Sequence, residues 1–283
     1  MKRMLAALLT LFAAIAQAVV VTDERGVSVD LAQPPRRIVS LLPSLTESVC
    51  TLGACERIVG VDRYSNWPES VRLLPQVGGG IDPNLEAVVA LRPDVVLLAE
   101  SSRVTGRLEA LGIKALVFQP KGYADVRRVL QALDRMLGTD DAQRVWRDIN
   151  AEVSAAARSV PPEARQLRVY FEVNGGPFAA SESSFIGETL GHLGEKNIVP
   201  ASMGPFPKLN PEFVVRADPD LIMAGERGAQ DLEQRPGWSR IKAVRDGRIC
   251  RFNADESDVL VRPGPRMGEA AWLMARCLMK ATR

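Results

Sequence analysis

The sequence predicts an α/β protein with two Rossmann-like lobes, each a central, mostly parallel sheet with flanking helices, joined by one long backbone helix. Short apolar, β-branched segments alternate with helical segments in both halves, which is typical of parallel sheets. The segments NLEAVVALRPDVVLLAE (84–100) and NPEFVVRADPDLIMAGE (210–226) are identical at seven positions at a constant offset of 126. A single amphipathic stretch lies between them. We expect a signal peptide (1–18), an N-terminal lobe (19–122), a linker region with the spanning helix (123–162) and a C-terminal lobe (163–283).

The first eighteen residues have the pattern of an export signal. Lys2 and Arg3 precede an apolar run, and Ala16-Gln17-Ala18 fits the small-x-small cleavage pattern. Cleavage after Ala18 would leave 283 − 18 = 265 residues with 34 basic and 34 acidic side chains, hence no net charge. The alternative is a retained membrane anchor. No later apolar run is long enough to span a bilayer, so we expect a soluble periplasmic protein.

In the N-terminal half, strand and helix signals alternate. Ser44 and Glu47 have the spacing of a capping box and predict a helix that stops at Gly53. Asn84 predicts the cap of a short helix that ends near Leu91. The remaining segments are predicted as strands at 37–42, 58–61, 94–99 and 115–118, a loop at 62–83 and a helix through Leu111.

The spanning helix is predicted over 139–159. Its apolar side chains recur at spacings of three and four, which places them on one face, and Pro161-Pro162 ends it. These side chains are Ala142, Val145, Ile149, Val153, Ala156 and Val160. The C-terminal half then repeats the plan, with strands at 168–173, 221–224 and 248–252 and helices at 184–193 and 265–279.

Composition excludes several functions. A net charge of +2 is no basic surplus for binding nucleic acid. His192 is the only histidine, so a multi-histidine metal site is impossible. The Gly78–Gly80 stretch lacks the dinucleotide-binding spacing, and no nucleophile motif or P-loop is present. Asp255, Glu256 and Asp258 could coordinate a hard cation, but a solvated acidic loop is the favoured reading. We therefore expect neither catalytic residues, nor a metal, nor a cofactor.

Four cysteines in an exported chain allow three pairings. Proximity along the chain favours Cys50–Cys55, which leaves Cys250–Cys277. The alternative is four unpaired thiols that pack as small hydrophobic side chains.

Candidate ligand-binding residues lie in loops that follow predicted strands, where α/β lobes bind ligands. Aromatic rings in polar loops rich in Gly and Pro suggest stacking platforms for a flat or bulky ligand, although each ring could instead anchor its own loop. The candidates are Tyr64, Trp67, Phe178, Phe206, Asp258 and Arg262.

A family resemblance covers essentially the whole mature chain. In order, an export signal, PRRIVSLLPSLTESV, VGVDRYSNWP, NLEAVVALRPDVVL, the long helix, NPEFVVRADPDLI and RPGPRMGEAAW resemble the helical-backbone (class III) periplasmic substrate-binding proteins of ABC importers. The likeness is closest to the cobalamin-binding branch, through the YSxxP loop, Gly176-Pro177-Phe178 and Ser257-Asp258…Arg262. It implies capture of a corrinoid by a monomer that docks on a permease dimer. An iron–siderophore or haem is the alternative ligand, and an exported two-lobed enzyme is the remote alternative.

The resemblance also implies roles for single residues. Glu86 and Glu212 match the two surface glutamates, one per lobe, that dock onto permease arginines; the simpler alternative is a favourable interaction with the helix dipole. Two positions depart from the corrinoid binders. Those proteins are richer in cleft tryptophan, whereas Gly78–Gly80 and Phe206 stand where tryptophan would help. Leu193 occupies the place of a cysteine, which implies that Cys277 lacks its usual bridge.

Overall fold

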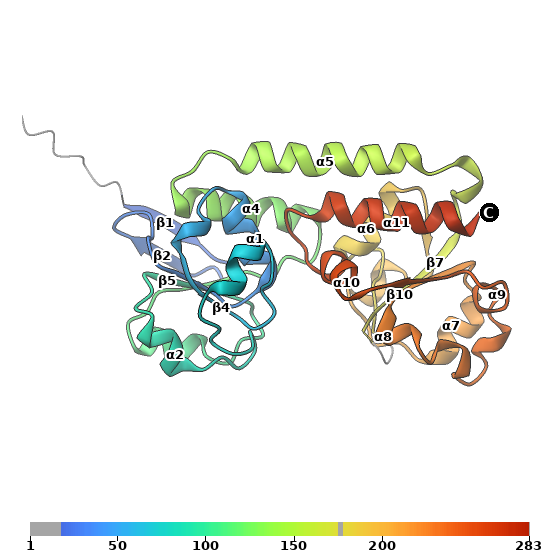
Figure 1. The fold of residues 1–283 in the computed structure, drawn as a ribbon, viewed down its shortest axis with the longest axis horizontal. Coiled ribbons are helices and arrows are strands. Elements are labelled where there is room, and N and C mark those ends of the chain that lie inside the picture. Colours follow the sequence, from blue (N-terminus) through green and yellow to red (C-terminus); the bar gives the residue numbers. More distant parts are fainter. Residues whose placement is uncertain (1–17, 175–177, 283) are drawn as a thin grey trace, which may run out of the picture.

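The computed structural model describes residues 18–174 and 178–282. The expected signal peptide therefore lies outside the described residues, apart from Ala18. Figure 1 shows two lobes side by side, with one long helix running across both of them. Both lobes contain parallel sheets, as predicted. The division at residues 122 and 162 remains our proposal.

The N-terminal lobe is built on a four-stranded parallel sheet in the order β4-β3-β5-β6. All four strands were expected from their apolar, β-branched runs. The strands are β3 (Ile38–Ser40), β4 (Ile58–Val61), β5 (Val95–Leu98) and β6 (Ala115–Val117), and the helices are α1 (Pro43–Thr51), α2 (Leu85–Ala90) and α3 (Thr105–Ala110). An antiparallel hairpin, β1 (Val19–Thr22) and β2 (Ser28–Leu31), and helix α4 (Tyr123–Leu137) are additions that we did not predict.

The C-terminal lobe has a five-stranded sheet in the order β11-β10-β7-β8, with β9 also paired to β7. Only β8 runs antiparallel. The strands are β7 (Arg168–Asn174), β8 (Phe178–Ala179), β9 (Lys196–Asn197), β10 (Leu221–Gly225) and β11 (Ile249–Phe252). The helices are α6 (Phe185–His192), α7 (Pro211–Ala217), α8 (Glu226–Ala229), α9 (Lys242–Arg245), α10 (Ala254–Val261) and α11 (Met267–Ala281).

Helix α5 (Ala142–Ser159) is the predicted spanning helix. Its eighteen residues reach about 27 Å, and it lies over α4 at one end and α11 at the other (Figure 1). Gly268 of α11 permits this close approach, because a Cβ there would lie 2.2 Å from the Glu152 carboxylate of α5. One continuous apolar core runs from the first lobe through these helices into the second.

Two local predictions need correction. Helix α1 begins at Pro43 after Leu42, without a side-chain cap, because the Glu47 carboxylate pairs with Arg262 instead. The stretch from Asp255 to Asp258 is the first turns of α10 and not a loop, since Asn253 and Glu256 form a capping box.

All four cysteines are paired. The disulfides join Cys50 to Cys55 and Cys250 to Cys277, the arrangement that chain proximity favoured. The resemblance implied that Cys277 would lack its usual bridge, since Leu193 occupies the place of the usual partner. In the structure Cys277 is bridged instead to Cys250 of β11.

The shared core leads to a prediction about motion. The backbone carbonyl of Lys121, in the segment after β6, accepts a hydrogen bond from the Phe185 amide at 2.7 Å. The Tyr123 and Thr189 hydroxyls are 2.9 Å apart. These contacts and α5 should restrain closure of the lobes. Small-angle scattering curves with and without ligand should therefore nearly superimpose. A marked compaction on ligand binding would contradict this prediction.

Candidate ligand-binding cleft

Two adjoining cavities lie where the lobes face each other, at the carboxyl ends of the parallel strands. One, of about 520 Å³, is lined by Tyr64 of the first lobe and by Glu172, the start of α8 (Gly225–Gly228), Phe252 and Asp258 of the second. The other, of about 480 Å³, belongs to the first lobe and also includes Tyr64. This is the place where open α/β lobes bind ligands.

The Tyr64 ring is the aromatic group shared by both cavities. It follows β4 and is 60% exposed. The Arg63 guanidinium carbon lies 5.9 Å from the centre of the ring, within the range of a cation–π contact. An exposed aromatic ring at the mouth of two cavities is suited to stacking on a flat ligand.

The other two candidate rings lie on the second lobe. Phe178 begins β8 and is 42% exposed; the preceding Gly175-Gly176-Pro177 lies outside the described residues. Phe206 is half-buried, with its ring centre 5.7 Å from that of Phe185. It lines a smaller cavity of about 270 Å³, which Gln119–Lys121 of the first lobe close on the other side. Phe206 thus both anchors its loop and forms a wall between the lobes.

The absence of tryptophan at Gly80 has a structural explanation. A Cβ on this residue would lie 2.3 Å from the Leu41 carbonyl oxygen, which is closer than any side chain tolerates. Gly80 lines the first-lobe cavity. The glycine therefore allows its loop to lie directly on the end of β3.

Behind the Tyr64 loop lies a buried polar cluster. The Arg262 guanidinium donates to Glu47 at 2.8 Å and to the Asn66 side-chain oxygen at 2.7 Å. It also donates to the Tyr64 carbonyl at 3.0 Å and lies 2.7 Å from Asp258. Burial raises the pKa of Glu47, and the Arg262 charge opposes that shift.

The candidate residues therefore divide into two groups. Tyr64 and Asp258 line the 520 Å³ cavity together. Arg262, whose side chain is 7% exposed, lies behind them. Trp67 is half-buried, with the Arg266 guanidinium carbon 5.1 Å from its ring centre. Arg262, Trp67 and Phe178 lie outside the set of residues that line the cavities.

Glu172 is a cleft residue that sequence reasoning missed. It lines the larger cavity from β7, while its carboxylate accepts two hydrogen bonds from Arg235, at 2.7 and 2.9 Å. The Tyr170 hydroxyl donates to the same carboxylate at 3.1 Å. The available signal was one acidic residue, Glu172, flanked by apolar residues within the strand RVYFEVN, because a buried charge needs a partner.

The cleft walls carry more acidic than basic groups. Burial raises the pKa of Asp62, and hydrogen bonds from Ser65 and the nearby Arg262 charge oppose the shift. Two arginines line the same cavities, Arg63 and Arg227. The lining carboxylates are Asp62, Asp82, Glu172, Glu226 and Asp258.

Glu86 and Glu212 lie away from the cleft cavities. Each is exposed and occupies the second position of its helix, α2 or α7. The Asn84 side chain caps α2 by accepting a hydrogen bond from the Ala87 amide, and the Asn210 side chain caps α7 by accepting one from the Glu212 amide. Figure 1 shows α2 and α7 on opposite lobes, both on the side of the molecule away from α5.

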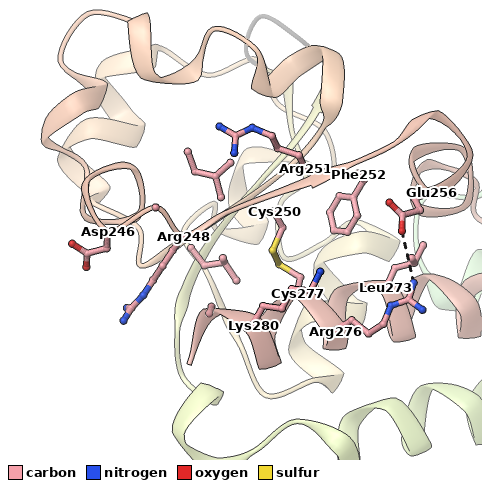
Figure 2. A pocket seen from close by; sticks show the side chains of 14 residues that line it. Asp246, Arg248, Cys250, Arg251, Phe252, Glu256, Leu273, Arg276, Cys277 and Lys280 are labelled. Atoms are coloured by element: carbon pink, nitrogen blue, oxygen red, sulfur yellow. Dashed lines mark ion pairs between the residues drawn. A yellow bond between two sulfur atoms is a disulfide. The ribbon is translucent and has the colours of Figure 1, made fainter. Parts of the chain in front are cut away.

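A separate pocket of about 550 Å³ lies on the outer side of the second lobe (Figure 2). The Cys250–Cys277 disulfide lies between β11 and α11 at its base, and Arg276 approaches Glu256 to 3.8 Å. Residues of one lobe alone line it. It therefore lacks the two facing lobes that mark the cleft.

The described residues contain neither a candidate metal-binding cluster nor a candidate membrane-spanning helix. Within residues 18–174 and 178–282, no three His, Cys, Asp or Glu side chains cluster in a way that could hold a metal ion. In the same part of the chain, no helix combines the length and apolar character needed to cross a membrane.

Comparison with known proteins identifies a family for this chain and relatives whose names give different ligands. A family model described as "Periplasmic binding protein" matches residues 38–256. The chain is 27% identical to the uncharacterized ABC transporter substrate-binding lipoprotein YvrC of Bacillus subtilis, over 93% of this chain and 86% of the relative. It is 29% identical to a cobalamin-binding protein of Halobacterium salinarum, over 92% of this chain and 74% of the relative.

A solved structure gives the same architecture. The periplasmic heme-binding protein RhuT from Roseiflexus sp. RS-1 matches with a TM-score of 0.74, covering 88% of this chain and 99% of its own. The two sequences are 24% identical, so this likeness concerns the fold alone.

Proposed function

Because this chain belongs to the periplasmic binding protein family, we propose that it captures a corrinoid of the cobalamin type in its cleft and delivers it to an ABC import permease. The chain is a substrate-binding protein for a ligand of the metal-chelate type, and not an enzyme. Its family is periplasmic or extracellular. Residues 1–18 would then be an export signal removed after Ala18, and the mature protein would act as a monomer.

The choice of a corrinoid depends on one observation, the excess of carboxylates over arginines around an exposed aromatic ring. The two cleft cavities are lined by five carboxylates and by Arg63 and Arg227. Glu172 and Asp258 are paired with Arg235 and Arg262, so Asp62, Asp82 and Glu226 are the carboxylates that face the ligand together with the two lining arginines. Haem and many ferric siderophores carry negative charges, which such walls repel. A corrinoid of the cobalamin type carries little net charge and presents neutral side-chain amides that can donate hydrogen bonds to carboxylates. Tyr64 would stack on its flat ring.

Haem is the second candidate, and the Tyr64 hydroxyl is the observation that favours it. A haem iron needs an axial ligand. His192 lies on α6 with its ring 5.1 Å from the Tyr123 ring, away from the cavities. An exposed Tyr64 in the cleft therefore remains as the candidate ligand.

Titration with several ligands tests the choice. Intrinsic tryptophan fluorescence should change saturably with cyanocobalamin and cobinamide, and more weakly or not at all with haem and ferric siderophores. Tight haem binding without corrinoid binding, accompanied by an absorption band that Tyr64→Phe removes, would replace the corrinoid proposal with haem.

The aromatic rings are expected to contribute directly to affinity. Tyr64→Ala and Phe178→Ala should each weaken cyanocobalamin binding several-fold, because a lost stacking contact costs about 1 kcal/mol. Tyr64→Phe is the matched control, since it keeps the ring and should keep the affinity. Unchanged affinity in both alanine variants, measured by titration calorimetry, would mean that these rings only anchor their loops.

Delivery requires a surface that a permease can recognise. We propose that Glu86 and Glu212 provide it, because each is exposed at the start of a helix and the two lie on different lobes. Charges placed in this pseudo-symmetric way suit a permease with two-fold symmetry, and complementary charges would fix the register of docking.

A further inference from the structure

We propose that Arg262 is a positioning residue of the cleft: its guanidinium holds the loop of residues 62–67 against the second lobe and so sets the place of the Tyr64 ring. This inference deepens the proposed function, since it assumes that Tyr64 touches the ligand. It assigns Arg262 a role that acts through Tyr64, in place of the direct ligand contact expected from the sequence.

Arg262 joins parts of the chain that are far apart in sequence. It follows α10 in the second lobe and donates to Glu47 of α1, 215 residues earlier. It also reaches the Asn66 side chain and the Tyr64 carbonyl, 196 and 198 residues earlier. Three points of the first lobe are therefore fastened by one side chain. A guanidinium can do this because its donors lie in a rigid planar fork.

The Asn66 amide is held on both sides. Its oxygen accepts from Arg262, and its nitrogen donates to Asp258 at 2.8 Å. Asp258 in turn lies 2.7 Å from Arg262, which closes a triangle of contacts across the two lobes. The Tyr64 carbonyl is bound directly, so the backbone is fixed at the residue whose ring enters the cavities.

The segment after Arg262 lies against the same part of the first lobe. A Cβ on Gly264 would be 3.4 Å from the Ser44 carbonyl oxygen, so this backbone runs close to α1. Arg266 lies 3.8 Å from Glu47 and also covers the Trp67 ring. The second lobe thus contacts this loop at Tyr64, Asn66 and Trp67.

The partners of Arg262 also argue against direct ligand contact. Each terminal nitrogen already has two oxygen partners: Glu47 and Asn66 for one, Tyr64 and Asp258 for the other. The side chain is 7% exposed and lies outside the residues that line the cavities. A ligand would meet Tyr64 and Asp258, with Arg262 behind them.

Arg262→Lys tests this role, because it keeps the charge and removes the fork. Hydrogen–deuterium exchange in 62–67 should rise about tenfold or more, the factor expected for losing a charge-assisted hydrogen bond. Arg251→Lys, at an exposed arginine of the same lobe paired with Glu233, is the control and should leave this exchange unchanged. The measurement needs no ligand, so a failure to bind corrinoids would sink the proposed function alone.

A double-mutant cycle on cyanocobalamin affinity separates positioning from contact. Arg262→Lys should weaken binding in the native background and have little further effect in the Tyr64→Ala background. Equal losses in both backgrounds would mean that Arg262 acts independently of Tyr64, and would overturn the proposal. Unchanged exchange in 62–67 would overturn it as well.

Asn66→Ala provides the same test if Arg262→Lys does not fold. It removes one link of the triangle while leaving the buried Glu47 paired with Arg262. The same rise in exchange and the same dependence on Tyr64 are expected, and their absence would contradict the inference.

Discussion

Arg235→Met should lower the free energy of unfolding by about 3 to 5 kcal/mol, the cost of leaving a buried charge without its partner. The Glu172 side chain is 1% exposed and its two carboxylate oxygens lie 2.7 and 2.9 Å from Arg235. The hydrogen bonds and charge of Glu172 raise the pKa of Arg235, so the guanidinium stays charged. Its carbon also lies 4.7 Å from the Trp238 ring centre.

Chemical denaturation measures this loss. The matched control is Arg251→Met, whose exposed pair with Glu233 should contribute about 1 kcal/mol or less. Arg235→Met combined with Glu172→Leu should be more stable than Arg235→Met alone, because no buried charge is left unpaired. A loss below about 1 kcal/mol in the single variant would show that water reaches Glu172 and replaces the arginine.

Transport should fall by about tenfold or more when Glu86→Ala is combined with Glu212→Ala, the scale of loss when charged contacts between partners are removed. Ligand titration should be unchanged, because both residues lie outside the cleft cavities. Each single variant should lose less than the pair, since the other glutamate still steers docking. Uptake and stimulated ATP hydrolysis in a reconstituted importer are the measurements.

A second pair of glutamates controls for net charge. Glu56→Ala with Glu163→Ala removes the same charge from exposed positions on the two lobes, away from α2 and α7. The protein that carries this control pair of substitutions should deliver its ligand at the normal rate. The difference between the two double variants should shrink at high salt, where exposed charges are screened. Normal transport by the folded Glu86/Glu212 variant would reject the docking role and leave only the interaction with the helix dipole.

The fold was largely predictable because its signals are local. The repeated Asn-x-Glu…Pro-Asp pattern specifies a capped helix and a buried strand, and the structure has α2 with β5 and α7 with β10 at those places. Helix α4 was missed although it carries the same kind of evidence as α5. Val126, Val129, Leu130 and Leu133 recur at helical spacing and are buried.

The site was predicted only in part, because its key partnerships are not local. Tyr64 and Asp258 are recognisable as polar loop or helix residues after strands, and both line the cleft. The spacing of Ser44 and Glu47 suggested a local cap, yet Glu47 binds a partner 215 residues away. No short-range pattern reports such a pair. Only the fold brings α1 and the end of α10 together.

The continuous core through α4, α5 and α11 has a consequence for the timing of transport. Lobes that move little, as this core predicts, should admit the ligand without a conformational step, so association should be set by diffusion and orientation. Release by the same path then needs no opening of the lobes either, so residence time should be set by the contacts between ligand and cleft. We therefore expect the permease to speed release by disturbing those contacts when it docks, and the free protein to release ligand at a rate that scarcely depends on lobe motion.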